Sequence, residues 1–299
     1  MTSDQPFELT RPPDGKTPWG QVRRLALIDF RLQYEGQVYR KDLKEFFDIS
    51  VQQASLDLAA YAALAPNQMR YDATIRRFVP GIGFKPLYGG EDAASYLNDL
   101  LALSSEVISR DESFIGTMPD YGIVPTLKRP LPASLLATVL LAIRKQRSLQ
   151  IRYQSMSREE PSVRDISPHA LGHDGFRWHV RAYCHKRQDF ADFVFGRMLE
   201  TQASIADWVD ATADTQWHTT VWLDLKPHPE LSPAQRAAIA LDYGMVNGHT
   251  RVKTRQALLF YALKRFGLNK RGEAEARTQH IELANRSELA QYLEEEAKE

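Results

Sequence analysis

The first eighty residues place apolar positions at helical spacing and then at strand spacing. Val22, Leu25 and Ile28 lie three positions apart, which puts them on one face of a helix. Ser50 is a good helix N-cap, and Pro66 ends the helix that Ser50 begins. The pattern predicts helices over residues 18–34, 40–47 and 51–64, followed by short strands over 69–72 and 75–79.

Helix, helix, short turn, helix and hairpin is the order of a winged helix-turn-helix, in which the third helix enters the major groove of DNA and the hairpin forms the wing. The inner side of the third helix is expected to carry Val51, Ala54, Leu58 and Tyr61. Leu56 fits neither side, and is expected either to pack on the second helix or to contact a thymine methyl group. The alternative to DNA binding is a small helical domain with a polar surface.

The expected DNA contacts come from the outer side of the third helix and from the wing. Glutamine pairs with adenine edges, and serine bonds phosphates or bases. Arginine gives the wing the charge that phosphates require. The predicted DNA-contacting residues are Ser50, Gln52, Gln53, Ser55, Arg70, Arg76 and Arg77.

A glycine-rich connector over residues 81–90 follows the wing, and it is not a phosphate loop because no Gly-Lys-Ser/Thr comes after it. Amphipathic helices are predicted over 91–103 and 131–147. They would bridge two domains and could form a dimer surface. The expected domains are a flexible arm (1–16), a winged helix-turn-helix (17–85), a helical linker or dimerisation segment (86–147), a β domain (148–208) and a C-terminal α/β extension (209–299).

From residue 149 the pattern changes to short apolar runs separated by turn residues. Five such antiparallel strands, preceded by a helix, predict a small curled barrel. The predicted strands cover 149–153, 163–171, 176–184, 190–195 and 199–206.

Polar and cationic residues interrupt the apolar pattern of this β segment. Ser167, His169 and Arg181 are expected on one side of the hairpin at 163–184, and Arg197 follows after the next loop. Such a cluster is costly to bury unless it holds an anion. The alternative is that the two arginines pair with carboxylates of the fold itself, namely Asp165, Asp192 or Glu200.

The C-terminal part carries a strand over 221–225, and helices are expected to begin near Ser232-Pro233 and near Lys253. A serine followed by proline is a good helix start. Residues 288–299 are acidic and are expected to form a frayed helix.

The chain has 38 Lys+Arg and 38 Asp+Glu, and a net charge of zero argues against a general polyanion binder. The charge is uneven, however. Residues 16–85 hold 11 Lys+Arg against 7 Asp+Glu, an excess of 4, and residues 250–277 hold 8 against 2, an excess of 6. Two separate anion-facing surfaces would account for this, and solvated helix faces are the alternative.

Several classes of protein are disfavoured. The single cysteine, Cys184, excludes a disulfide framework and a cysteine zinc site, and a buried inert thiol is expected. No run approaches the ~18 apolar residues that span a bilayer, and the polar, proline-rich start is unlike a signal peptide, so a cytoplasmic location is expected. The chain has no His-Glu-x-x-His and no nucleophile elbow. Neither enzymatic activity nor a metal or other cofactor is therefore expected.

Trp178-His179-Val180 resembles the segment that names the WYL domain, with His and Val in place of the second and third letters. The flanking segments 166–171, 181–183 and 195–198 also match that family's pattern. The order from Ile49-Ser50 to residues 64–72 is similar to repressors that accompany phage-defence operons of the BREX and CBASS kind. The resemblance extends from Trp19 to about Leu268.

The resemblance implies an Sm-like barrel that senses a nucleic acid fragment or a nucleotide-type signal. The positions that match the family's ligand site are Tyr153, Ser167, His169, Arg181 and Arg197. Two guanidinium groups can hold a phosphate. Tyr153, Trp178 and Tyr183 could offer stacking surfaces for bases, although for Trp178 packing in the core is expected instead. The C-terminal extension is implied to take part in dimer contacts and in closing over the ligand. There Arg251, Lys253 and Arg255 could complete an anion site in the partner subunit, or could mark only a solvated basic helix start.

These observations together predict a multidomain α+β repressor that binds double-stranded DNA as a homodimer on an inverted-repeat operator. An anionic effector at the WYL domain would control it, and a phage-defence operon would be its target. The alternative is an Sm-like RNA-binding or nuclease-associated protein, in which the barrel acts and the N-terminal domain only positions it. Binding of duplex DNA discriminates between the two.

Overall fold

The computed structural model describes residues 18–89, 93–125, 127–269 and 278–296. The chain divides into two units, Met1–Pro125 (unit 1) and Thr126–Glu299 (unit 2), which are described one at a time. The predicted arm over 1–16 lies outside the described residues.

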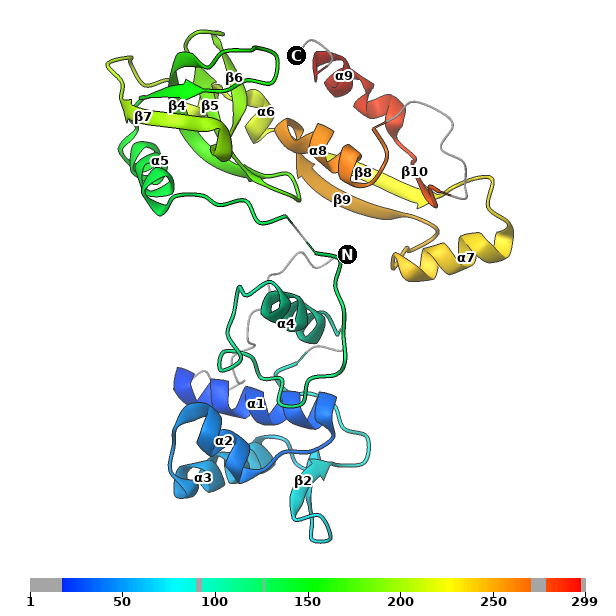
Figure 1. Cartoon of the computed structure of the whole chain (residues 1–299). Coiled ribbons are helices and arrows are strands. Elements are labelled where there is room, and N and C mark those ends of the chain that lie inside the picture. The colour runs from blue at the N-terminus through cyan, green and yellow to red at the C-terminus, as the bar shows by residue number, and fades with distance from the viewer. Residues whose placement is uncertain (1–17, 90–92, 126, 270–277, 297–299) are drawn as a thin grey trace. The chain divides into compact units, whose positions relative to one another are not determined.

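Unit 1 begins with three helices and a hairpin, and this order confirms the expected winged helix-turn-helix (Figure 1). The second wing strand begins at Arg77 rather than Ile75, because Arg76 lies in the turn with a left-handed φ of 55°. A fourth helix follows after the connector. The elements are α1 (Trp19–Glu35), α2 (Arg40–Phe47), α3 (Val51–Leu64), β1 (Met69–Asp72), β2 (Arg77–Pro80) and α4 (Ala94–Ser104).

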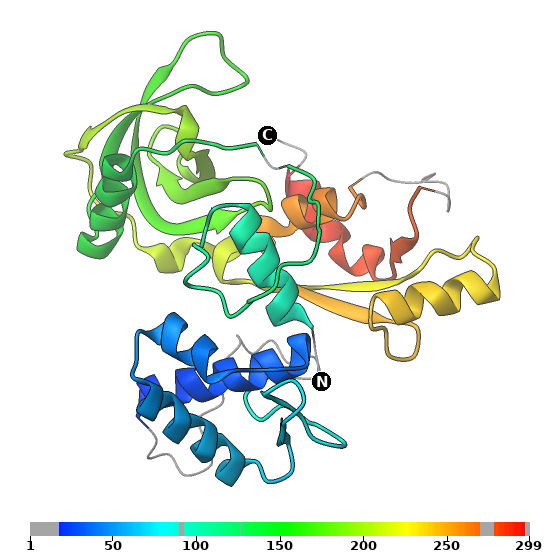
Figure 2. The ribbon, with the colours of Figure 1, turned by 60° about the horizontal axis from the view of Figure 1, so that its bottom comes forward.

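The core of unit 1 follows the predicted helical periodicity. Leu25 and Ile28 of α1 pack with Leu58 and Tyr61 of α3, and all four are at most 2% exposed. The wing is joined to this body by paired backbone hydrogen bonds between Val38 and Phe78 of 2.9 and 3.1 Å. In Figures 1 and 2 the hairpin, coloured cyan, projects from the helical body of the unit.

Unit 2 opens with one helix and a five-stranded antiparallel sheet, in which every predicted strand is present. The hydrogen-bonded order is β6-β5-β4-β3-β7, and no pairing between β6 and β7 closes the sheet within the described residues. The hydrogen bonds between these strands therefore form an open sheet and not the expected barrel. The elements are α5 (Ala133–Lys145), β3 (Leu149–Tyr153), β4 (Ser162–His173), β5 (Trp178–Cys184), β6 (Asp189–Val194), the 3₁₀ turn η1 (Phe195–Arg197) and β7 (Met198–Ala203).

The two faces of this sheet differ in chemistry. Val180, Ala182 and Cys184 alternate along β5, are fully buried, and pack in one core with Val139 of α5. The opposite face carries the polar residues of the same strand. Because the β4–β5 register shifts between Pro168 and Ala170, a β-bulge redirects the intervening side chain.

Short helices of the C-terminal part contact this polar face through Asp214 and Tyr261. The C-terminal part also contains a second sheet, ordered β10-β8-β9. Gly172 of β4 permits the approach, since a Cβ there would lie 3.2 Å from Leu258 Cδ2. The elements are η2 (Ala211–Ala213), α6 (Thr215–His218), β8 (Thr220–Pro227), α7 (Pro233–Asp242), β9 (Thr250–Arg255), η3 (Gln256–Leu258), α8 (Leu259–Arg265), β10 (Ile281–Leu283) and α9 (Arg286–Glu296).

The expected helix start at Lys253 is wrong, because residues 250–255 form strand β9 paired with β8. The predicted start at Ser232-Pro233 is confirmed. The Ser232 hydroxyl accepts a hydrogen bond from the Gln235 amide, and the Gln235 side chain accepts one from the Ser232 amide. This reciprocal pair is a capping box.

Candidate functional site

Two serine side chains near the start of helix α3 form hydrogen bonds with the backbone of the helix. The Ser50 hydroxyl accepts a hydrogen bond from the Gln53 amide at 3.1 Å, which satisfies a free donor at the helix start. The Ser55 hydroxyl donates to the carbonyl of Val51 at 2.9 Å. Asp48 precedes the cap with φ 50° and makes the sharp turn from α2.

A buried ion pair fixes α3 to α1. Asp57 is fully buried, and Arg24 Nε lies 2.6 Å from its Oδ2 atom. The Gln53 side chain donates to Asp57 Oδ1 at 3.2 Å. Gln53 therefore leans toward this pair, whereas Gln52 is exposed.

A second buried carboxylate, Asp29, joins α1, α3 and the connector after the wing. Its Oδ1 atom accepts from the Tyr61 hydroxyl at 2.6 Å and from the Leu87 amide at 2.8 Å. Its Oδ2 atom accepts from the amides of Tyr88 and Gly89 at 2.9 and 3.0 Å. Burial, and then the charge of Asp29, raise the pKa of Tyr61. Sequence patterns did not point to this junction.

The outer side of α3 is more apolar than expected. Val51 is 49% exposed and Leu56 is 64% exposed. The inward assignment of Val51 is therefore wrong, and Leu56 is not part of the core cluster of unit 1. Ala54, Leu58 and Tyr61 are buried as predicted.

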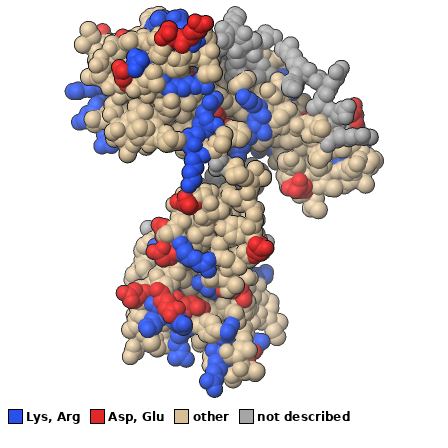
Figure 3. Space-filling model, viewed as in Figure 1, with Lys and Arg blue, Asp and Glu red and all other residues tan. Residues whose placement is uncertain are grey.

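The three wing arginines differ in their surroundings. Arg70 and Arg76 are exposed, and Arg70 makes only a loose contact of 3.8 Å with Asp72. The Arg77 guanidinium instead stacks 4.2 Å from the ring centre of Tyr39, a cation–π contact with the body of the domain. Figure 3 shows cationic side chains at the tip of the wing, at the lower end of unit 1.

In unit 2 the structure brings together two of the predicted ligand residues, His169 and Arg181, around an acid that sequence reasoning missed. Arg181 donates to Asp214 through Nε at 2.7 Å and Nη2 at 3.0 Å. The His169 Nε2 atom lies 2.9 Å from the same carboxylate. Arg181 also lies 3.5 Å from Asp192 and donates to Gln216 at 3.0 Å. The alternative of pairing with Asp192 is thus confirmed for Arg181, with Asp214 as the closer partner.

The side chains of His169, Arg181 and Asp214 are at most 5% exposed. This burial affects the pKa values of the acids and of Arg181. Burial favours a higher pKa for Asp214, but hydrogen bonds from His169 and Arg181 outweigh burial and hold the pKa below its usual range. Burial raises the pKa of Asp192 despite the nearby positive charge of Arg181. Burial would lower the pKa of Arg181, yet its two carboxylate partners raise it. Arg181 remains charged.

The other predicted ligand residues lie apart from this cluster. The Ser167 hydroxyl is fully buried, 2.9 Å from Ser148 Oγ and 3.0 Å from His185 Nε2. Tyr153 packs in the sheet core against Phe193. The half-buried Arg197 side chain has no hydrogen bond or ion pair within the described residues.

Two neighbours of these residues, Trp178 and His179, begin strand β5. Trp178 is 53% exposed against the ring of His173, so its predicted core position is wrong. His179 is buried with its Nε2 atom 2.9 Å from Asp174. Burial alone would raise the pKa of Asp174, but hydrogen bonds from His179 and two backbone amides lower it.

The predicted closing residues all lie on the exposed face of β9. Arg251, Lys253 and Arg255 alternate with half-buried residues. Arg255 donates to the carbonyl of Trp217 at 2.6 Å and stacks on its ring at 4.6 Å, so it is tied to α6, next to Asp214.

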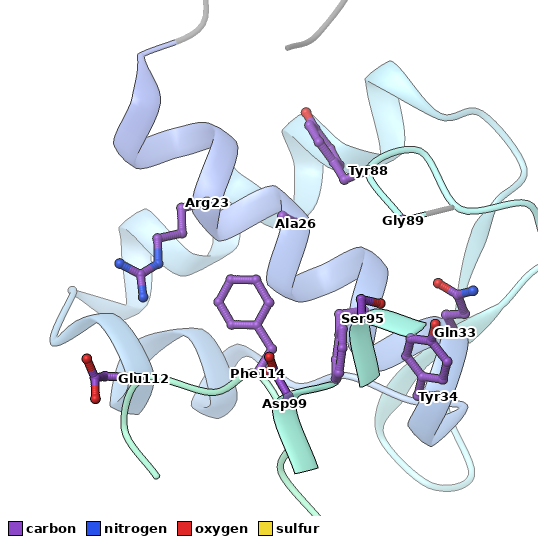
Figure 4. Close-up of a pocket in the computed structure, with 11 residues that line it drawn as sticks. Arg23, Ala26, Gln33, Tyr34, Tyr88, Gly89, Ser95, Asp99, Glu112 and Phe114 are labelled. Atoms are coloured by element: carbon purple, nitrogen blue, oxygen red, sulfur yellow. The ribbon is translucent and has the colours of Figure 1, made fainter. Parts of the chain in front are cut away.

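Each of the two units contains a cavity near these elements. One in unit 1, between α1 and α4, has a volume of about 180 Å³ and is lined by aromatic rings that include Phe114 (Figure 4). It is smaller than the ~300–1,000 Å³ of typical ligand pockets. One in unit 2, of about 680 Å³, is lined by Lys145, Arg147, Ser148 and Trp208, and Ser148 connects it to Ser167.

The described residues contain no group of three or more His, Cys, Asp or Glu that could hold a metal ion. In the same part of the chain, no helix combines the length and apolar character of a membrane span.

Family models match three successive segments. The model described as "BrxR transcriptional regulator winged helix-turn-helix domain" matches residues 20–102, "WYL domain" matches 134–203, and "BrxR transcriptional regulator, C-terminal dimerization domain" matches 220–289. Fold and matches together define the class as winged-helix regulators with a WYL domain.

Curated relatives make the assignment narrower. A protein of Stenotrophomonas maltophilia named "DNA-binding transcriptional repressor CapW" is 44% identical over 94% of this chain and 95% of its own length. Proteins of the same name from Pseudomonas aeruginosa and Escherichia coli are 41% and 40% identical, over 98% and 91% of this chain and 97% and 91% of their own. The chain belongs to the CapW family of DNA-binding transcriptional repressors. This agrees with the expectation that it is a regulator and not an enzyme.

One solved structure, the proteasome accessory factor B/C of Arthrobacter aurescens, is 16% identical, with a TM-score of 0.27, and the match covers 97% of this chain and 51% of that one.

Proposed function

We propose that this protein is a sequence-specific DNA-binding transcriptional repressor. The observation that carries the proposal is the winged helix-turn-helix, whose α3 is fixed from within by Asp29 and Asp57 and exposes its outer side. Helix α3 would enter the major groove, and Arg70 and Arg76 of the wing would contact phosphates. The names of the relatives support this function.

The protein acts as a homodimer on an inverted-repeat operator. Support comes from the family description of residues 220–289 as a dimerization domain. A two-fold dimer presents two α3 helices, which match two half-sites about one helical turn apart.

The test is a binding titration with the DNA upstream of the protein's own gene and a scrambled duplex of equal length. Gln52→Ala weakens binding to the specific duplex, while Gln53→Ala has a smaller effect because Gln53 is bonded to Asp57. Equal binding to both duplexes overturns the proposal.

An anionic effector, of nucleic acid or nucleotide type, controls DNA binding through the WYL domain. Arg181 and His169 both bond to the Asp214 carboxylate. In the proposed mechanism an effector phosphate binds to the same two side chains in its place. An effector would exchange with the Asp214 carboxylate. Because Asp214 also accepts from the Trp217 amide and caps α6, the exchange would release α6 and the segment that follows.

The exchange regulates DNA binding only if the effector has different affinities for the DNA-bound and free states. A 5′-phosphorylated single-stranded oligonucleotide is the first probe. It changes the operator affinity of the wild type and leaves Arg181→Ala unaffected, with Arg181→Lys as the variant that keeps the charge. An unchanged response of Arg181→Ala removes Arg181 from the effector site.

Tyr153, Ser167 and Arg197, and a closing role for β9 in the partner subunit, stay predictions that the same assay tests. We further propose a phage-defence operon as the regulated target. Transcription of the neighbouring genes, measured before and after phage infection, tests that assignment.

A further inference from the structure

The outermost line of helix α3 is unusual for an exposed helix face. Its exposed members recur at spacings of four, three and four residues, as Gln52, Leu56, Ala59 and Ala63. Leu56 is 64% exposed, and α3 as a whole contains no Lys or Arg. A solvent-facing helix normally carries charged residues on this side.

The charges near α3 lie beside this line and not on it. Arg70 and Arg76 of the wing are exposed, and this arrangement fits a polyanion whose backbone meets the wing. Pairing with a second copy of α3 would give these two arginines no anionic partner, because the strip formed by Gln52, Leu56, Ala59 and Ala63 carries no carboxylate. The groove of such a polyanion must then offer an apolar group to Leu56.

In the major groove of DNA that group is the 5-methyl of thymine, which apolar side chains contact directly. We infer that Leu56 is a specificity-determining residue that reads a thymine methyl group in each half-site, an inference that rests on the proposed DNA-binding function. Ala59 and Ala63 have short side chains, so Leu56 is the only large apolar side chain among these four residues.

The spacing along α3 adds a positional expectation. Gln52, whose amide matches an adenine edge, precedes Leu56 by four residues, or about 6 Å of helix. Base pairs are ~3.4 Å apart along one strand. The thymine read by Leu56 therefore lies about two base pairs from the adenine read by Gln52.

The experiment replaces each thymine of the bound operator with deoxyuridine, which lacks only the methyl group. The operator is the tightest duplex selected by the full-length protein from a random library. Affinities are measured for the wild type, Leu56→Ala and Leu64→Ala. Leu64 is the matched control, a leucine 41% exposed at the far end of the same helix.

For the wild type, one substitution in each half-site removes two methyl contacts and weakens binding about fifteenfold, which corresponds to ~0.8 kcal/mol for each buried methylene-sized group. Leu56→Ala binds the thymine operator more weakly and loses sensitivity to that substitution. Leu64→Ala behaves like the wild type. Since Leu56 is exposed, its replacement leaves the fold intact, which a thermal unfolding curve checks.

Two results overturn the assignment while leaving DNA binding in place. One is wild-type affinity that is the same for every deoxyuridine operator. The other is a Leu56→Ala variant that keeps the full sensitivity, so that another residue reads the methyl. If Leu56→Ala changes the oligomeric state in sedimentation but not DNA affinity, the strip is a protein contact and the inference fails. Selection of no duplex at all instead overturns the proposed function.

Discussion

Replacement of Asp29 by Asn tests how the DNA-binding unit is held together. Asn has nearly the shape of Asp but only one accepting oxygen. With that oxygen kept toward Tyr61 and Leu87, its amide group faces the amides of Tyr88 and Gly89, which now bond to Asp29 Oδ2. Two buried donors then lose their acceptor, at ~1–3 kcal/mol each.

The expected loss is about 2–6 kcal/mol of unfolding free energy, out of the ~5–15 kcal/mol that such proteins possess. Tyr61→Phe is the graded control. It removes one donor and leaves Asp29 with its three backbone partners, so about 1–2 kcal/mol is expected.

The assay is urea unfolding of the full-length protein combined with hydrogen exchange of the amides at 87–89. In Asp29→Asn these amides exchange faster than in the wild type and in Tyr61→Phe. An unfolding free energy within ~0.5 kcal/mol of the wild type, the range of neutral surface changes, with unchanged protection of these amides, would refute the reasoning.

The remaining predictions concern the two binding surfaces. Gln52→Ala should lose about 1–3 kcal/mol for each half-site of the operator and nothing on scrambled DNA, as fluorescence anisotropy can measure; an equal loss on both contradicts base reading. Arg76→Ala should weaken all sequences alike and reduce the slope of log affinity against log salt by about one per site, whereas an unchanged slope excludes a phosphate contact. Asp214→Asn should destabilise unit 2, because the folded pKa of Asp214 is lowered. That stability is present above the unfolded pKa of ~3.9 and is lost as pH falls toward the folded value, so the difference from wild type in urea unfolding should be constant above about pH 5 and shrink below pH 4; a difference that grows in acid contradicts this.

Much of the fold could be predicted because it follows local periodicity. The predicted positions agree within a few residues with the three N-terminal helices, the N-caps Ser50 and Ser232, and all five strands of the sheet that opens unit 2. The prediction that a helix begins near Lys253 is wrong, because Thr250–Arg255 form strand β9. Its alternation of exposed and half-buried side chains has the period of a strand, and its pairing with β8 decides the outcome.

The site could be predicted only in part, because its decisive contacts join distant positions. Arg181 and His169 are conspicuous in the sequence, but Asp214 lies 33 residues beyond Arg181, in a segment without periodicity. The bulge that turns His169 toward Asp214 is likewise a feature of strand pairing. Asp29 gives no sequence signal, since one acid on a helix is ordinary until its partners 58–60 residues away are known.

The central claim is that α3 and the wing read a specific duplex. The most direct measurement compares the affinity of the full-length protein for the DNA upstream of its gene and for a scrambled duplex, at one physiological salt concentration. The account predicts at least ~10³-fold tighter binding to the first, as for typical specific regulators. Equal affinity for the two duplexes would contradict it.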